Sequence, residues 1–297
     1  VYDATNQQTG EQLKLKCETP VEYISYPVRK FDPVELDLNL TTNFNFLTVA
    51  QLSPRKNIRQ LIKCFVDNFK DNEDVGLIIK ANTAKNSLID RINTLSGFRE
   101  IMSTYKDRKC KIYLLHGFLN DQKMAGLYAH PKIKAFVSAT HGEGFGLPIF
   151  EAAYYGLPIL ATDWSGHLDF LYKPQTQKNK KIKNKHMFGR ISYTLQPIQE
   201  DVHWEGVLDK NSMWAYPEEG SIKMNLEEVY KDYGRFSKRA KELQKWVCEE
   251  FEEKKQYAEY VDHFKELFKD QIEQQLEELA DFEDISSKVV ELSLIHI

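Results

Sequence analysis

The sequence predicts an α/β fold in which a doubly wound parallel sheet is followed by a helical C-terminal tail. Five short, mostly apolar runs are separated by amphipathic segments between Phe44 and Ala161, the alternation typical of a sheet covered by helices. The runs are rich in β-branched and aromatic residues, as expected for parallel strands buried on both faces. From Leu226 onward, apolar residues instead recur at helical spacing.

The strands and helices are predicted in chain order from these patterns. The predicted strands are Phe44–Ala50, Val75–Lys80, Ile112–His116, Ala135–Ser138 and Leu157–Ala161, with a further strand at Ile191–Leu195. The first helix has one apolar face made of Ile58, Leu61, Ile62, Phe65 and Phe69. The later helices are Ser87–Lys106, with Leu88, Ile92, Leu95 and Ile101 as its apolar residues, then Asp121–Ala129 and Leu147–Tyr155.

A glycine-rich loop, Thr140–Gly146, joins the fourth strand to the helix that begins at Leu147. Glycines let the backbone adopt unusual dihedral angles and let a ligand come close. Unpaired amides at a helix start favour an anion. The loop residues expected to bind it are Gly144, Phe145, Gly146 and Leu147. Two acids, Glu143 and Glu151, frame the loop and suit the hydroxyl groups of a ligand. The combination of phosphate and hydroxyls suggests a nucleotide or a nucleotide sugar.

Cations follow two neighbouring strands at the same predicted sheet edge. Arg55 and Lys56 lie in the turn after the first strand, where they could neutralise a diphosphate and stabilise it as a leaving group. The alternative is a solvated basic turn, and the glycine loop favours ligand binding. Lys80 ends the second predicted strand. Phosphate binding and a simple strand cap both stay open for this residue.

The run Glu143-Gly-Phe-Gly-Leu-Pro-Ile-Phe-Glu151-Ala, followed by Gly156-Leu-Pro, resembles the donor-site motif of retaining glycosyltransferases of GT-B architecture, family 4 type (glycosyl transferases group 1). The resemblance covers Asn43–Leu171 well and continues loosely to Tyr233. It implies the Rossmann-like C-terminal domain of that architecture. It also implies that Glu143 is the catalytic-site acid beside the donor sugar and that Glu151 binds the donor ribose. Lys56 matches the lysine of the family, whereas Gln51 stands where the family has arginine.

The resemblance implies a domain organisation as well. Residues 1–40 are expected to be the end of an N-terminal domain and a linker, residues 41–230 the nucleotide-sugar-binding domain, and residues 231–297 C-terminal helices. A GT-B enzyme needs two Rossmann-like domains of ordinary size. The N-terminal one is therefore expected to be missing, and the chain is predicted to be the donor-binding half of a larger enzyme.

Composition limits the other classes of function. A net charge of −4 and a pI near 6.1 argue against a general nucleic-acid-binding protein. Four scattered cysteines suit a reducing compartment, so a cytoplasmic location is expected. No apolar run reaches the roughly 20 residues of a membrane helix. Lys173–His186 holds six lysines and no acid. A solvated insertion loop is favoured there, while an anionic acceptor or a peripheral membrane contact stays open.

The predicted activity is transfer of a sugar from a nucleotide diphosphate sugar to an acceptor hydroxyl, with the retention that the resemblance implies. No Asp-x-Asp pair occurs, so neither a metal nor any cofactor beyond the nucleotide-sugar substrate is expected. The alternative is a non-catalytic half or subunit that binds nucleotide sugars. A dinucleotide oxidoreductase is disfavoured because the third glycine comes one position too early for G-x-G-x-x-G. The base, the sugar and the acceptor (a saccharide, a lipid-linked molecule or another) stay open.

Overall fold

The computed structural model describes residues 2–5, 12–15, 23–177, 180–269, 271 and 273. The chain divides into two compact units, Val1–Pro27 with Phe251–Ile297 and Val28–Glu250. In the first unit, β1 (Tyr2–Thr5) and β2 (Gln12–Leu15) pair as an antiparallel hairpin, and α8 (Glu253–Leu267) is a helix. Part of the predicted helical tail, residues 274–297, lies outside the described residues. The predicted boundaries at residues 40 and 230 stay predictions.

The second unit is built around a six-stranded sheet in which every described pairing is parallel. The strand order is β10-β7-β6-β3-β4-β5. The strands are β3 (Phe44–Gln51), β4 (Val75–Asn82), β5 (Lys111–Leu115), β6 (Ile133–Ser138), β7 (Ile159–Thr162) and β10 (Gly189–Ile191). Chain order runs outward from β3 in one direction and then from β6 in the other, which is the order of a doubly wound sheet. The predicted α/β fold class is confirmed.

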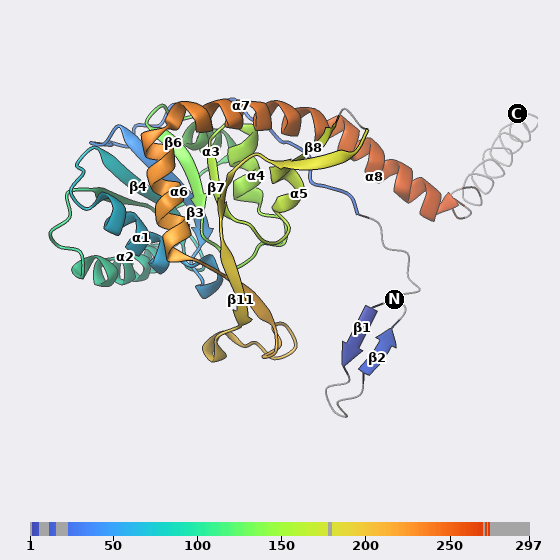
Figure 1. Ribbon diagram of the computed structural model, residues 1–297, viewed down its shortest axis with the longest axis horizontal. Helices are drawn as coiled ribbons and strands as arrows, with labels where there is room; N and C mark the ends of the chain where they lie inside the picture. The colour runs from blue at the N-terminus through green and yellow to red at the C-terminus, as the bar shows by residue number, and fades with distance from the viewer. Residues whose placement is uncertain are drawn as a thin grey trace, which may run out of the picture. The chain divides into compact units, whose positions relative to one another are not determined.

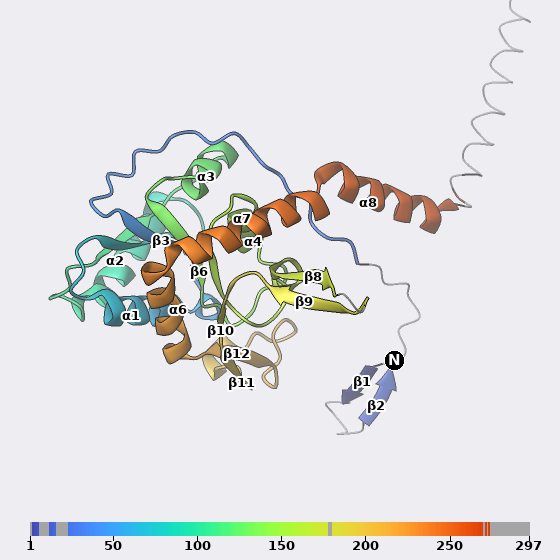
Figure 2. The same cartoon turned by 45° about the horizontal axis from the view of Figure 1, so that its top comes forward.

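Helices cover both faces of this sheet (Figures 1 and 2). The helices α1 (Ile58–Phe69), α2 (Leu88–Ser103) and α6 (Glu219–Lys231) pack on one face, and α3 (Asp121–Tyr128) and α4 (Leu147–Tyr154) on the other. The long helix α7 (Tyr233–Glu250) packs against α4 and α6. Gln244 of α7 donates to the carbonyl of Tyr154 at the C-terminal end of α4, 3.0 Å away. The helix α7 therefore runs along the amino edge of the sheet and leaves the carboxyl edge uncovered.

The core on the α1 face was predictable from helical spacing. Ile58, Leu61, Ile62, Phe65 and Phe69 are all buried. The rings of Phe65 and Phe69 lie 5.3 Å apart, and Phe46 of β3 lies 5.7 Å from Phe69. Both ring pairs are tilted, and aromatic contacts of this kind add specific geometry to the burial of apolar area. These contacts thus fix α1 against the sheet, close to the turn that joins β3 to α1.

The predicted apolar face of α2 is wrong at its first turns. Leu88 is 70% exposed and Ile92 58% exposed, whereas Asp90 and Thr94 are buried. Asp90 accepts hydrogen bonds from the amides of Thr83 and Ala84, at 3.2 and 3.0 Å. These bonds fix the acid against the end of β4, and the helix therefore turns its first apolar residues outward.

Two antiparallel hairpins lie outside the sheet, one before β10 in the chain and one after it. The lysine-rich segment forms β8 (Tyr172–Thr176) and β9 (Ile182–His186), and the region predicted as one strand at Ile191–Leu195 divides between β10 and β11 (Tyr193–Pro197). The strand β11 pairs with β12 (Met213–Pro217) and projects past the carboxyl edge of the sheet (Figure 1). Among the described residues, no helix combines the length and apolarity needed to span a bilayer.

We expect Phe65→Ala to lower the free energy of unfolding by about 3–5 kcal/mol, because the deletion leaves a cavity among closely packed rings. Leu88→Ala, on the exposed first turn of α2, should change it by no more than about 0.5 kcal/mol. Urea unfolding followed by circular dichroism measures both. Equal losses in the two variants would contradict the assignment of this core.

Candidate functional site

The candidate site lies where the order of the strands reverses, between β3 and β6. These strands are neighbours in the sheet, yet the helices that follow them, α1 and α4, pack on opposite faces (Figure 2). The two connections therefore diverge at the carboxyl edge, the usual ligand position in such sheets, and we call the surroundings of Arg55, Lys56 and Glu143 at this point the crevice. The first connection is η1 (Pro54–Lys56), a short 3-10 helix, and the second is the glycine loop. They are joined because the Arg55 carbonyl accepts from the amide of His141 at 2.8 Å and from Thr140 Oγ1 at 3.1 Å.

Three predicted site residues meet in this crevice. Lys56 Nζ lies 2.5 Å from Glu143 Oε1, and Arg55 Nη1 lies 3.1 Å from Glu143 Oε2. Arg55 also donates to the Gly142 carbonyl. The side chains of Glu143 and Lys56 are only 9% and 14% exposed, compared with 38% for Arg55. Burial would raise the pKa of Glu143, but the hydrogen bond and charge of Lys56, with Arg55 beside it, hold that pKa below its ordinary value of 4.5. Glu143 is therefore ionised at neutral pH.

The main chain fixes the position of Glu143. Its amide donates to Ser165 Oγ at 2.7 Å, and its carbonyl accepts from the amide of Gly166 at 3.1 Å. A Cβ atom on Gly166 would stand 1.8 Å from the Gly144 carbonyl oxygen. Only glycine permits this approach between the loop after β7 and the loop after β6. The loop after β7 thus holds the backbone of Glu143 in place.

The helix α4 begins from a left-handed residue, Gly146, with φ of 88°. Its carbonyl accepts from the amides of Ile149 and Phe150, at 2.9 and 3.0 Å, while Leu147 opens the helix and is 46% exposed. The ring of Phe145 points inward, 5.1 Å from the rings of Phe150 and Phe170. Within the described chain, the amides of Gly144, Gly146 and Leu147 have no hydrogen-bond acceptor. The loop therefore presents donors at a helix start beside two cations, an arrangement suited to an anion.

Glu151 lies one turn into α4 and has a different environment from Glu143. Its Oε2 accepts a hydrogen bond from the Tyr128 hydroxyl of α3 at 2.7 Å. Burial raises the pKa of Glu151 above 4.5, against the opposing effect of the Tyr128 hydrogen bond. Tyr128 is fully buried and its own pKa is raised by burial and by Glu151. No feature of the sequence linked these two residues.

Lys80 is not brought together with Glu143. The strand β4 continues past it to Asn82, and its buried ammonium donates to the Gly117 carbonyl at 2.7 Å. Burial lowers its pKa. In the structure Lys80 holds the loop after β5, in which Gly117 has φ of 117° and Phe118 is 78% exposed.

Two buried histidines beside the crevice were not predicted. His141 Nδ1 donates to the Ala215 carbonyl at 2.8 Å, and its ring stacks on Trp214 at 5.3 Å. This contact fixes the β11–β12 hairpin next to the glycine loop. His167 Nε2 donates to the Thr162 carbonyl at 2.7 Å. Burial lowers the pKa of both histidines, so they are neutral at pH 7. The aromatic run around Trp214 was visible in the sequence, but nothing in it pointed to His141.

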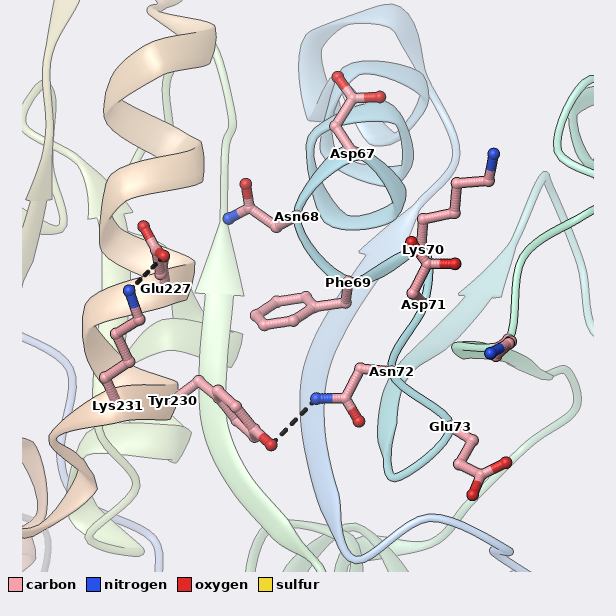
Figure 3. Close-up of a pocket in the computed structure, with 11 residues that line it drawn as sticks. Asp67, Asn68, Phe69, Lys70, Asp71, Asn72, Glu73, Glu227, Tyr230 and Lys231 are labelled. Atoms are coloured by element: carbon pink, nitrogen blue, oxygen red, sulfur yellow. Dashed lines mark hydrogen bonds and ion pairs between the residues drawn. The ribbon is translucent and has the colours of Figure 1, made fainter.

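The cavities of this unit include two that are not lined by Glu143. One of about 630 Å³ lies at the amino edge, between the end of α1 and α6 (Figure 3). Two pairs of its polar side chains are in contact: Glu227 with Lys231, and Asn72 with Tyr230 at 3.0 Å. The other, of about 640 Å³, adjoins η1 between α1 and α2. Among the described residues, no group of three or more His, Cys, Asp or Glu is placed to hold a metal ion.

The chain contains a doubly wound α/β domain with a glycine-rich loop and two cations at its topological switch point. Residues 32–177 match the model of the glycosyl transferases group 1 family. The chain is 29% identical over 119 residues to the serotype-specific mannosyltransferase WbdA of Escherichia coli, covering 40% of this chain and 13% of WbdA. It is 22% identical over 161 residues to the GtfA subunit of a UDP-N-acetylglucosamine–peptide N-acetylglucosaminyltransferase from Streptococcus pneumoniae, covering 54% of this chain and 29% of that protein.

Solved structures share the fold. HepE from Anabaena, crystallised with UDP and glucose, matches with a TM-score of 0.53 at 16% identity, over 77% of this chain and 50% of HepE. Sucrose-phosphate synthase from Thermosynechococcus elongatus matches with a TM-score of 0.54 at 15% identity, over 80% of this chain and 50% of that protein. The chain thus spans about half of these structures and less than a third of the curated relatives named above. The predicted resemblance to group 1 glycosyltransferases is confirmed.

We expect Gly166→Ala to lower the free energy of unfolding by about 1–3 kcal/mol, because the new methyl group collides with backbone that cannot move without releasing Glu143. The control is Gly97→Ala in α2, where a Cβ meets nothing within 4 Å. That change should stabilise the chain by about 0.5–1 kcal/mol, since alanine is the better helix former. Thermal and urea unfolding report both. An unchanged free energy of unfolding in Gly166→Ala would show that the contact between Gly166 and Gly144 is not rigid.

The two acids should make opposite contributions to the pH dependence of stability. The raised pKa of Glu151 means that the folded chain retains a proton which the unfolded chain has released, so this contribution falls as pH rises from about 4.5. The lowered pKa of Glu143 gives a contribution that is present above its unfolded pKa and is lost as pH falls through its folded pKa. Relative to wild type, Glu151→Gln should therefore gain stability as pH rises, and Glu143→Gln should lose it. Urea unfolding between about pH 3.5 and 7 tests this, and trends of the same sign would contradict it.

Proposed function

We propose that this chain is the donor-binding half of a glycosyltransferase that moves a sugar from a nucleotide diphosphate sugar to an acceptor hydroxyl. The observation that carries the proposal is the meeting of Lys56, Arg55 and Glu143 at the switch point, beside the amides that begin α4. Cations and helix-start amides suit the diphosphate. An ionised carboxylate beside them suits the hydroxyls of the sugar. The match of residues 32–177 to the glycosyl transferases group 1 family supports the same conclusion.

In this proposal, different residues bind different parts of the donor. Lys56, Arg55 and the amides of Gly144, Phe145, Gly146 and Leu147 bind the diphosphate. Glu143 positions the sugar and supports the positive charge that develops on it. Glu151 binds the ribose hydroxyls, and Tyr128, through its 2.7 Å hydrogen bond, orients the carboxylate of Glu151. Lys80 acts indirectly, because it holds the loop after β5 by the Gly117 carbonyl.

In the proposed reaction, the bond between the anomeric carbon and the diphosphate oxygen breaks as the acceptor oxygen attacks from the same face, so that the configuration is retained. The acceptor proton passes to an oxygen of the leaving phosphate. Lys56, Arg55 and the helix-start amides stabilise the negative charge on the leaving group. In this proposal the protein cations take the place of a metal bridge, in keeping with a sequence that has no Asp-x-Asp pair.

The acceptor site belongs, in this proposal, to a second Rossmann-like domain that packs against the carboxyl edge of the sheet. The chain spans half of the solved GT-B relatives, which supports a partner domain of similar size. The acceptor is a saccharide, a lipid-linked molecule or another hydroxyl compound. The scattered cysteines support a cytoplasmic location, and the lysines of β8 and β9 leave peripheral contact with a membrane open.

A second candidate is a non-catalytic module that binds nucleotide sugars. The short coverage of the relatives favours it for this chain taken alone. Calorimetry with UDP-, GDP- and ADP-sugars, followed by a search for transfer and donor hydrolysis, separates the two candidates. Binding without any turnover, including after addition of candidate acceptor domains, would favour the module. Absence of binding to all these donors would refute both.

We expect Lys56→Met to weaken nucleotide-sugar binding by about 10- to 100-fold, the loss typical of one charge-assisted hydrogen bond. Lys63→Met is the matched control, because Lys63 pairs with Glu219 on the exposed surface of α1 and does not reach the crevice. It should leave the affinity unchanged. Isothermal titration calorimetry measures both, and equal affinities for the Lys56 variant and wild type would exclude Lys56 from the phosphate site.

A further inference from the structure

Both cations of the crevice already carry an anion, the carboxylate of Glu143. Its two oxygens are divided between them, with Oε1 2.5 Å from Lys56 and Oε2 3.1 Å from Arg55. A phosphate that binds these cations must share them with Glu143 or replace it. Because the Glu143 side chain is only 9% exposed, water cannot take over the hydrogen bonds that it would lose.

The backbone that carries this carboxylate is also fixed. The Glu143 amide and carbonyl are held by Ser165 and Gly166, at 2.7 and 3.1 Å. On the other side, the Arg55 carbonyl is held by the amide of His141 and by Thr140. The two connections are therefore fixed against each other. A bare diphosphate on Lys56 and Arg55 would lie next to a buried carboxylate that had lost its partners. Such a like-charge contact is unfavourable, and so is an unpaired buried charge.

We propose that Glu143 makes the site select against diphosphates that lack a sugar. A nucleotide sugar brings hydroxyls that donate to the carboxylate and replace the hydrogen bonds from Lys56 and Arg55. A nucleoside diphosphate brings the negative charge without these donors. The inference rests on the proposed function, in which Lys56 and Arg55 bind the diphosphate. It has a consequence for turnover: once the sugar has left, the same carboxylate repels the diphosphate product and speeds its release.

The test compares three ligand pairs by calorimetry: UDP with UDP-glucose, GDP with GDP-mannose, and ADP with ADP-glucose. In whichever pair the wild-type protein binds, it should bind the sugar nucleotide more tightly than the nucleoside diphosphate. Glu143→Gln keeps the shape but removes the charge, so it should bind the nucleoside diphosphate at least about tenfold more tightly than wild type. Its affinity for the sugar nucleotide should stay equal or fall, so that the preference reverses.

Glu219→Gln is the matched control, since Glu219 also pairs with a lysine but on the exposed face of α1 and α6. It should change neither affinity. Should Glu143→Gln unfold below the assay temperature, Glu143→Asp takes its place: the carboxylate is drawn back by one methylene, and the diphosphate should bind more tightly by a smaller factor.

The outcomes separate the two proposals. If wild type binds a pair but the Glu143 variants bind the diphosphate no more tightly than wild type does, the selection by Glu143 is wrong and the proposed function stands. If wild type binds none of the six ligands, the proposed function fails and the selection fails with it.

Discussion

The structure of the site depends on one constraint of the sheet, the pairing of β3 with β6 at the point where the strand order reverses. The connections after these strands lead to helices on opposite faces, yet two hydrogen bonds to the Arg55 carbonyl tie them together. This brings Lys56 and Glu143, which are 87 positions apart in the chain, to 2.5 Å. A buried carboxylate needs such partners. The ion pair is therefore a consequence of the topology, and it allows the Glu143 carboxylate to be buried.

The two acids of the glycine motif differ because their surroundings differ, although both are on the same short stretch of chain. Glu143 is in the loop beside two cations, which keep its pKa low in spite of burial. Glu151 is inside α4, next to a tyrosine hydroxyl, and no cation of the described residues pairs with it, so burial dominates and its pKa rises. The position of each acid relative to the helix start sets this difference. One acid is suited to carry a fixed negative charge, and the other to accept hydrogen bonds from hydroxyls.

The sequence predicted what depends on local pattern. The apolar face of α1 is buried as its spacing requires, and Arg55, Lys56 and Glu143 meet because strand ends share one edge of a parallel sheet. It did not predict contacts between distant polar groups. The outward turn of Leu88 follows from the hydrogen bonds of Asp90, and the place of Lys80 follows from the Gly117 carbonyl. Such hydrogen bonds leave no periodic pattern in the sequence. In both places they decide where the side chain lies, whatever the spacing of apolar residues around it.

Charge and geometry are separable at Glu143, and this follows from the way the loop is held. Its backbone is positioned by Ser165, by the close approach of Gly166, and by the left-handed Gly146 at the start of α4. None of these contacts uses the carboxylate. The ion pair with Lys56 and Arg55 adds to a loop that is already fixed, so a neutral side chain of the same shape should leave the amides of the loop where they are. The cations would then be open to another anion. The backbone alone sets the shape of the loop. The charge of Glu143 therefore mainly affects which ligands the crevice can bind.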